Sequence, residues 1–173
     1  MHEVVYQLVG NDTMAEMCEL VRTMPQGCVV EVGVYQGGSA MWLDKVCQEQ
    51  QRELWLYDTF TGIPYQGPDD SHKVGDFGDT DAEKVSRLIP KAQVVKGLFP
   101  DSIQKMPPVA FAHIDVDQYE SYKGCLDALA PLMVPGGVMW FDDVGCLEGA
   151  NRAVREWGRP LEVAKCGKVY ARF

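Results

Sequence analysis

One stretch near the N-terminus constrains the fold more than any other part of this 173-residue chain. Residues 28–32 form an apolar, largely β-branched run, and a glycine-rich turn over residues 33–38 follows at once. Residues 38–50 then have a helical pattern. A buried strand, a glycine-rich turn and a helix in this order are typical of the cofactor crevice of an α/β domain, because glycine permits a tight turn and a close approach of backbone to ligand.

Glu31, the acid in this strand, limits the class of ligand that the crevice can bind. A carboxylate beside the crevice repels phosphate, which is usually bound by basic side chains or free backbone N–H groups. It suits a ligand with cationic or hydroxyl groups instead. S-adenosylmethionine (SAM) carries an ammonium group, a sulfonium and a ribose diol, and it has no phosphate. We therefore expect a SAM site that includes Glu31, Gly33, Gly37, Gly38 and Ser39.

The composition indicates one ordinary globular domain over residues 1–173. The net charge of −9 argues against nucleic acid as the main partner, because no basic stripe is present to neutralise phosphates. No apolar run approaches the length of a membrane span, and the N-terminus lacks the pattern of a signal peptide. Six widely spaced cysteines form no Cys-x-x-Cys pair, which predicts free thiols in a reducing cytoplasm.

Strand and helix patterns alternate along the chain. Strands are predicted at residues 28–32, 53–57, 93–96, 109–114 and 137–141, with a closing hairpin of 161–165 and 169–173; helices are predicted at 11–24, 38–50, 81–88, 119–133 and 149–157. Side-chain caps are expected from Asn11 or Asp12, from Thr80 and from Asp117. The alternation predicts a single-domain, Rossmann-like three-layer α/β sandwich with a seven-stranded, mostly parallel sheet and an antiparallel C-terminal hairpin.

The segment 61–79 is rich in Gly, Pro and Asp and has no hydrophobic period. A loop of this length inside a compact domain usually has a function or lacks order. It leaves the carboxyl end of the second strand, which is the edge where ligands bind in such sheets. We expect it to act as a mobile lid over the cofactor, and a merely solvated loop is the alternative.

Further cofactor contacts are expected at the ends of the second and third strands. Asp58, followed by Thr59 and Phe60, stands where an acid can accept hydrogen bonds from both ribose hydroxyls of an adenosine cofactor. The loop after the third strand lies against the adenine in this fold. Gly97 would permit close approach there, and Phe99 would pack either on the adenine ring or in the core.

Carboxylates follow the fourth and fifth predicted strands. Asp115 and Asp117 come after one, and Asp142 and Asp143 after the other. Because adjacent strands lie about 5 Å apart, Asp115, Asp142 and Asp143 are expected to converge, and their repulsion requires a proton or a cation. Oxygen ligands favour Mg²⁺ or another hard divalent ion such as Ca²⁺, and the lack of Cys or His in the cluster disfavours zinc.

Several separate motifs resemble the macrocin O-methyltransferase (TylF-like) family of class I SAM-dependent methyltransferases. They are Glu31-x-Gly33-x-x-x-Gly37, Asp58-Thr59-Phe60-x-Gly62, Ile114-Asp115-x-Asp117-x-Tyr119-Glu120-Ser121, Pro135-Gly136-Gly137 and Asp142-Asp143. The resemblance implies a SAM- and Mg²⁺-dependent enzyme that methylates sugar hydroxyls of natural products. It also implies that Asp115 is both a metal ligand and the general base, with Asp142 and Asp143 as the other metal ligands.

The chemistry is consistent with this interpretation. A divalent ion lowers the pKa of a bound hydroxyl, and a nearby carboxylate removes the proton. His113 is a rival base, although its place inside a strand favours a packed core residue. Only about two dozen residues precede the first strand, so much of the region that shapes the acceptor pocket is expected to be missing. The acceptor is then a sugar or another diol, including a catechol, and a homodimer is one way to complete the pocket.

Three alternatives remain open at this point. Asp115-x-Asp117 after an apolar strand also matches the metal motif of a glycosyltransferase that binds a nucleotide sugar. A non-catalytic binding protein with the SAM fold is a second alternative, although three converging acids have no use in a pure scaffold. A methyltransferase that works without metal is the third.

Overall fold

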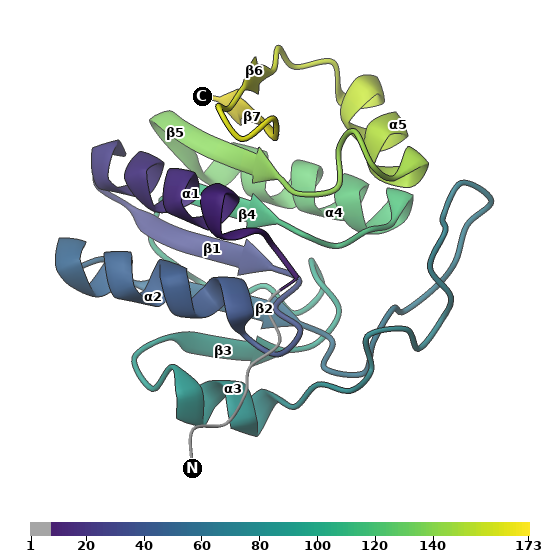
Figure 1. Ribbon diagram of the computed structural model, residues 1–173, viewed down its shortest axis with the longest axis horizontal. Coiled ribbons are helices and arrows are strands. Elements are labelled where there is room, and N and C mark those ends of the chain that lie inside the picture. Colours follow the sequence, from purple (N-terminus) through teal and green to yellow (C-terminus); the bar gives the residue numbers. More distant parts are fainter. Residues whose placement is uncertain (1–7) are drawn as a thin grey trace.

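The computed structural model describes residues 8–173, which form a three-layer α/β sandwich (Figure 1). The strands of these residues are β1 (Cys28–Val32), β2 (Leu54–Asp58), β3 (Gln93–Lys96), β4 (Val109–Ile114), β5 (Met133–Phe141), β6 (Glu162–Val163) and β7 (Val169–Arg172). The helices are α1 (Asn11–Thr23), α2 (Gly38–Gln50), α3 (Ala82–Leu88), α4 (Tyr119–Leu129), the short 3₁₀ helix η1 (Ala130–Leu132) and α5 (Glu148–Trp157). None of these helices is long and apolar enough to cross a membrane.

The seven strands form one sheet in the order β3-β2-β1-β4-β5-β7-β6. The pairs among β1 to β5 are parallel, whereas β7 runs antiparallel to both β5 and β6. The carboxyl ends of the parallel strands therefore meet at one edge of the sheet, and the long loop between β2 and α3 extends from that side (Figure 1). The predicted fold class, including the antiparallel hairpin, is confirmed.

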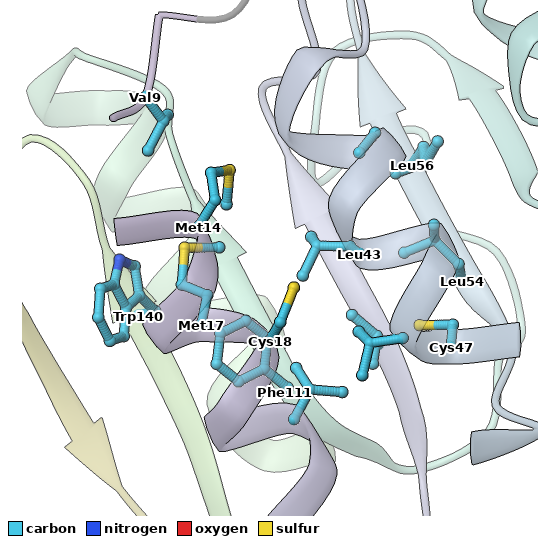
Figure 2. Close-up of a cluster of buried hydrophobic side chains, with 14 of the residues drawn as sticks. Val9, Met14, Met17, Cys18, Leu43, Cys47, Leu54, Leu56, Phe111 and Trp140 are labelled. Atoms are coloured by element: carbon cyan, nitrogen blue, oxygen red, sulfur yellow. The ribbon is translucent and has the colours of Figure 1, made fainter. Parts of the chain in front are cut away.

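Side chains alternate between the two faces of the sheet and build two separate cores. Val29 and Phe111 belong to the core under α1, α2 and α3, whereas Val30 and Ala112 belong to the core under α4 and α5. Figure 2 shows the first core, where Met14 and Met17 of α1 lie close to Trp140 of β5. The methionines of α1 thus pack against the sheet.

Most helices and strands begin and end within two residues of the predicted positions, but β5 begins at Met133 instead of residue 137, and α4 ends at Leu129 instead of residue 133. The predicted helix 119–133 is shorter because Pro131, which has no N–H, stands in a 3₁₀ turn after α4. All three expected side-chain caps are wrong. Gly10 precedes α1 without a side-chain cap, and Asp81 rather than Thr80 caps α3 by accepting the N–H groups of Glu83 at 2.8 Å and Lys84 at 3.0 Å. The cap of α4 comes from a distant residue and is described with the site.

The turn after β1 passes very close to the chain that leaves β4. Gly33 has a φ of +89°, and a β-carbon built on it would lie 1.7 Å from the backbone oxygen of Asp115. No side chain fits in that space, and the left-handed backbone further disfavours any residue other than glycine. This contact fixes the distance between the glycine-rich turn and the first acid of the predicted metal site.

We predict that Gly33→Ala lowers the free energy of unfolding by about 3–5 kcal/mol, because a steric clash adds to the cost of the left-handed conformation. Gly167→Ala is the matched control. Gly167 has a φ of +91° but open space around its added β-carbon, so its cost is expected to be about 1–2 kcal/mol. Urea denaturation of both variants measures the difference. Equal costs would contradict the close approach of Gly33 to Asp115.

Candidate active site

One cavity opens at the carboxyl ends of the parallel strands, and it collects most of the predicted site residues. Its wall comes from the turn after β1, the end of β2 and the loops after β3, β4 and β5. The predicted cofactor-binding residues that line it are Gly33, Gly38, Ser39, Asp58, Thr59, Gly97 and Phe99, and the predicted metal ligands Asp115, Asp142 and Asp143 line it as well. Residues that are far apart in the sequence therefore share one wall.

Gly37 and Phe60 are not among the residues that line the cavity. Gly37 precedes α2 in a left-handed conformation, with a φ of 88°. Phe60 is 4% exposed and packs in the core. Both residues shape the turns that carry the cavity wall, and a direct contact with a cofactor stays a prediction for each.

Glu31 lies in a different place from the one expected. It lies within β1, and the alternation of side chains directs it into the core under α1 and α2 instead of beside the crevice. Its Oε1 lies 2.8 Å from Nδ1 of His113 on the neighbouring strand, and both side chains are fully buried outside the cavity wall. His113 is therefore a core residue, as its position in the strand favoured, and it is not a candidate base.

Asp58 ties the end of β2 to the glycine-rich turn. Its Oδ2 accepts the backbone N–H groups of Val34 at 2.7 Å and Tyr35 at 2.8 Å, and its Oδ1 accepts that of Phe60 at 2.7 Å. Three charge-assisted hydrogen bonds hold this carboxylate in the wall of the cavity. Asp58 therefore lies at the carboxyl edge of the sheet, as expected, and its hydrogen bonding to ribose hydroxyls stays a prediction.

Three carboxylates converge on the opposite side of the cavity. One oxygen each from Asp115, Asp142 and Asp143 lies within 4.8 Å of the others. A buried hydroxyl and a backbone amide hold the third acid, because Oδ2 of Asp143 accepts the hydroxyl of Tyr122 at 2.9 Å and the N–H of Asp117 at 3.0 Å. The loops after β4 and β5 are thereby linked, and the cluster has a fixed shape.

Burial and mutual repulsion make this cluster electrostatically costly. Burial, followed by the charges of Asp143, Asp142 and Asp117, raises the pKa of Asp115 well above its usual range. The same two causes raise the pKa of Asp117 to about 7. Burial also raises the pKa of Asp143, although its hydrogen bonds with the Asp117 N–H and the Tyr122 hydroxyl oppose the shift. Such a group of acids is stabilised by a bound cation.

Known proteins include clear relatives of this chain. The family model of macrocin O-methyltransferase (TylF) matches residues 2–165. The chain belongs to this family. O-methyltransferase activity is thus supported for it, together with the SAM-dependent methyltransferase fold.

The relatives of this TylF-family protein described next share between 18% and 28% of their aligned residues with it. A 4'-O-methyltransferase of a rhamnosyl-tetracenomycin from Streptomyces olivaceus is 28% identical over 179 residues, which cover 89% of this chain and 68% of the relative. The structure of the O-methyltransferase NovP has a TM-score of 0.82 at 23% identity and covers 96% of this chain and 81% of its own. An O-methyltransferase from Bacillus cereus in complex with SAH has a TM-score of 0.62 at 18% identity, with coverages of 95% and 82%. Both structures support the fold.

The segment 61–79 of this TylF-family protein is tied down by specific contacts. Asp70 is buried, and it caps α4 by accepting the N–H of Tyr119 at 2.9 Å while its other oxygen accepts the N–H of Gly67 at 2.8 Å. The hydroxyls of Tyr65 and Ser121 lie 3.0 Å apart. The side-chain amide of Gln118 donates to the backbone oxygen of Tyr65. The loop is therefore docked on the start of α4, and its proposed movement as a lid is untested.

Asp117 is one of several residues whose role the sequence did not reveal. It was expected to cap α4, but it adopts a φ of 61° and lines the cavity, and its own N–H donates to Asp143. Its position in the motif Asp115-x-Asp117 could have indicated that it lines the cavity.

Tyr35 and Phe77 also line the cavity, and their rings meet edge to face with centroids 5.7 Å apart. Nothing in their sequence surroundings indicated this pairing.

We predict that Asp70→Ala lowers the free energy of unfolding by about 1–2 kcal/mol, because α4 loses its cap. It should also speed hydrogen exchange across residues 62–76, since the loop loses its buried anchor. Asp69→Ala is the neighbouring control: it breaks only the half-exposed pair with Arg152 at 2.7 Å, for a cost of less than about 1 kcal/mol. Denaturation and hydrogen-exchange mass spectrometry report both effects. Unchanged exchange in Asp70→Ala would contradict the docking of the loop.

Proposed function

We propose that this protein transfers a methyl group from SAM to a hydroxyl of a sugar or another diol-bearing small molecule, with assistance from a divalent cation such as Mg²⁺. The observation that carries the proposal is the composition of the cavity wall. Among the described residues that line it are five aspartates, and there is no Lys, Arg or His. A wall of this kind suits a cationic cofactor and a metal ion, and it opposes a diphosphate.

The SAM part of the proposal rests on the fit of the cavity. The turn at Gly33 and Gly38 permits close approach of the methionine portion, and Asp58 stands at the end of β2, where it can face a ribose. Gly97 and Phe99 offer a small gap and an aromatic edge for the adenine. The complex of the Bacillus cereus enzyme with SAH adds support from a protein of the same fold.

The metal part of the proposal rests on the donor set. Asp115, Asp142 and Asp143 supply only carboxylate oxygens, which suit Mg²⁺, and Oδ1 of Asp142 is buried with no hydrogen-bond partner. A bound divalent cation would lower the pKa of an acceptor hydroxyl and offset the charge of the cluster. A free buried carboxylate oxygen is otherwise costly, so its presence favours a ligand at this position.

Side chains of the protein perform the two remaining tasks, which are removal of the acceptor proton and exclusion of water. Asp115 is proposed as the general base that accepts the proton of the acceptor hydroxyl, and Asp117 lines the same cavity. The docked loop 61–79 contributes Ile63, Pro64 and Phe77 to the wall, and these apolar groups exclude water from the methyl donor.

The acceptor class comes from the relatives. The Streptomyces olivaceus enzyme is named for methylation of a rhamnosyl group, so a sugar hydroxyl on a natural product is the acceptor we propose first. A cytoplasmic location and a homodimer that completes the acceptor pocket are part of the same proposal, as is the lack of a nucleic-acid or membrane partner.

Calorimetric titration with S-adenosylhomocysteine and, separately, with UDP tests this function, each with and without Mg²⁺. We expect S-adenosylhomocysteine to bind in both conditions and UDP in neither, because the wall repels a diphosphate. Asp115→Asn should keep the binding of S-adenosylhomocysteine and reduce methyl transfer at least about 100-fold, since it removes the base and a metal ligand.

Three results would contradict the proposal in whole or in part. Mg²⁺-dependent binding of UDP without binding of S-adenosylhomocysteine would favour the metal-dependent glycosyltransferase. Full methyl transfer in the presence of EDTA would exclude a role for the metal but would still support methyltransferase activity. Binding of S-adenosylhomocysteine with no transfer to any sugar, catechol or other diol would favour a non-catalytic binding protein.

A further inference from the structure

A lysine of the C-terminal hairpin reaches the acidic cluster. Lys168 precedes β7, and its Nζ lies 3.1 Å from Oδ2 of Asp142 and also donates to the backbone oxygen of Asp142. Among the ion pairs of residues 8–173, this one alone joins a Lys or Arg to the three converging acids. The contact therefore sets Asp142 apart from Asp115 and Asp143.

The lysine approaches from outside the cavity. Lys168 does not line the cavity wall, whereas Asp142 does. Only Oδ2 of Asp142 is occupied by the ammonium group, and Oδ1 is buried with no hydrogen-bond partner. One oxygen of this carboxylate is thus anchored by the protein, and the other is available to a ligand in the cluster.

The sheet holds the lysine in place. Val169 pairs with Phe141 in the antiparallel ladder of β5 and β7, so Lys168 stands beside the residue that follows Phe141, which is Asp142. The side chain of Lys168 is 24% exposed, and its two contacts with Asp142 restrict its rotation. Two acceptors on one residue therefore hold the ammonium group beside Asp142.

We propose that Lys168 is a positioning residue of the metal site, which holds Asp142 so that its free oxygen faces the divalent cation. This inference rests on the proposed metal site. It also accounts for charge, because three carboxylates exceed a divalent cation by one negative charge, and the ammonium group supplies the missing positive charge. Partners that orient metal ligands in this way typically change metal affinity by about 10–100-fold when they are removed.

The physical alternative is that Lys168 weakens the binding of the metal. An ammonium group near the cluster also repels a divalent cation, and if repulsion exceeded orientation, removal of the lysine would tighten metal binding. Lys168→Met separates the two, since it keeps most of the apolar stem and removes the charge and both contacts. Lys165→Met is the matched control, because Lys165 is an exposed lysine of the same hairpin and forms none of the ion pairs that residues 8–173 make with the three acids.

The test measures metal binding directly. Free Mn²⁺ is quantified by electron paramagnetic resonance during titration of the wild type, Lys168→Met and Lys165→Met, and S-adenosylhomocysteine affinity reports an intact cavity. We expect Mn²⁺ to bind Lys168→Met about 10–100-fold more weakly than the wild type, with Lys165→Met unchanged and S-adenosylhomocysteine affinity retained in all three. If Lys168→Met does not fold, Lys168→Gln carries the same expectation, because glutamine removes the charge and its side chain is one bond shorter than that of lysine.

Three outcomes would overturn the proposal. Tighter Mn²⁺ binding in Lys168→Met would show repulsion in place of positioning, and equal binding would show a purely structural hairpin contact. Equal loss in Lys165→Met would show that net charge alone is responsible. Absence of Mn²⁺ binding in the wild type, with S-adenosylhomocysteine still bound, would instead overturn the metal site on which this inference rests.

Discussion

The repulsion among Asp115, Asp142 and Asp143 is the constraint on which the rest of the site depends. Bringing one oxygen of each within 4.8 Å is unfavourable unless the surroundings compensate. The protein provides part of the compensation through the Tyr122 hydroxyl and the Asp117 N–H, both donated to Asp143. A cation at the free oxygens would supply the remainder. A fold that only required stability would have no reason to retain this arrangement.

The strand order converts this cluster into a site for group transfer. Because β1 lies between β2 and β4, the turn at Gly33 stands between Asp58 on one side and Asp115 on the other. The close approach of Gly33 to the backbone of Asp115 keeps the two halves of the cavity together. A cofactor laid across the strand ends would place its adenine near β3 and its reactive end near the acids.

Much of this arrangement was predictable from local sequence, for physical reasons. Short apolar runs predicted the correct bounds of β1, β3 and β4, and a helical pattern predicted those of α2. The acids after β4 and β5 were placed correctly because parallel strands end at one edge of the sheet. Glu31 was misjudged because a single residue of offset along a strand moves a side chain to the other face. Its pairing with His113 depends on the neighbouring strand.

The remaining features depend on contacts between distant segments. Asp70 caps α4 from a loop without periodicity, and Lys168 reaches Asp142 from the far hairpin, so neither contact has a local signal. Asp117 was assigned to a cap because a helix starts directly after it, although the loop supplies that cap from Asp70. Tertiary structure thus decides which of several nearby acids performs which task.

The most direct test of a shared site for the metal and the methyl donor is the nuclear relaxation of bound S-adenosylhomocysteine when Mn²⁺ is added to the protein. With the cation at the ends of β4 and β5 and the adenine near the loop after β3, the protons beside the sulfur should relax markedly faster than the adenine protons. Asp142→Asn should weaken the effect. Equal relaxation along the whole molecule, or strongest relaxation at the adenine, would contradict a shared site for metal and methyl donor.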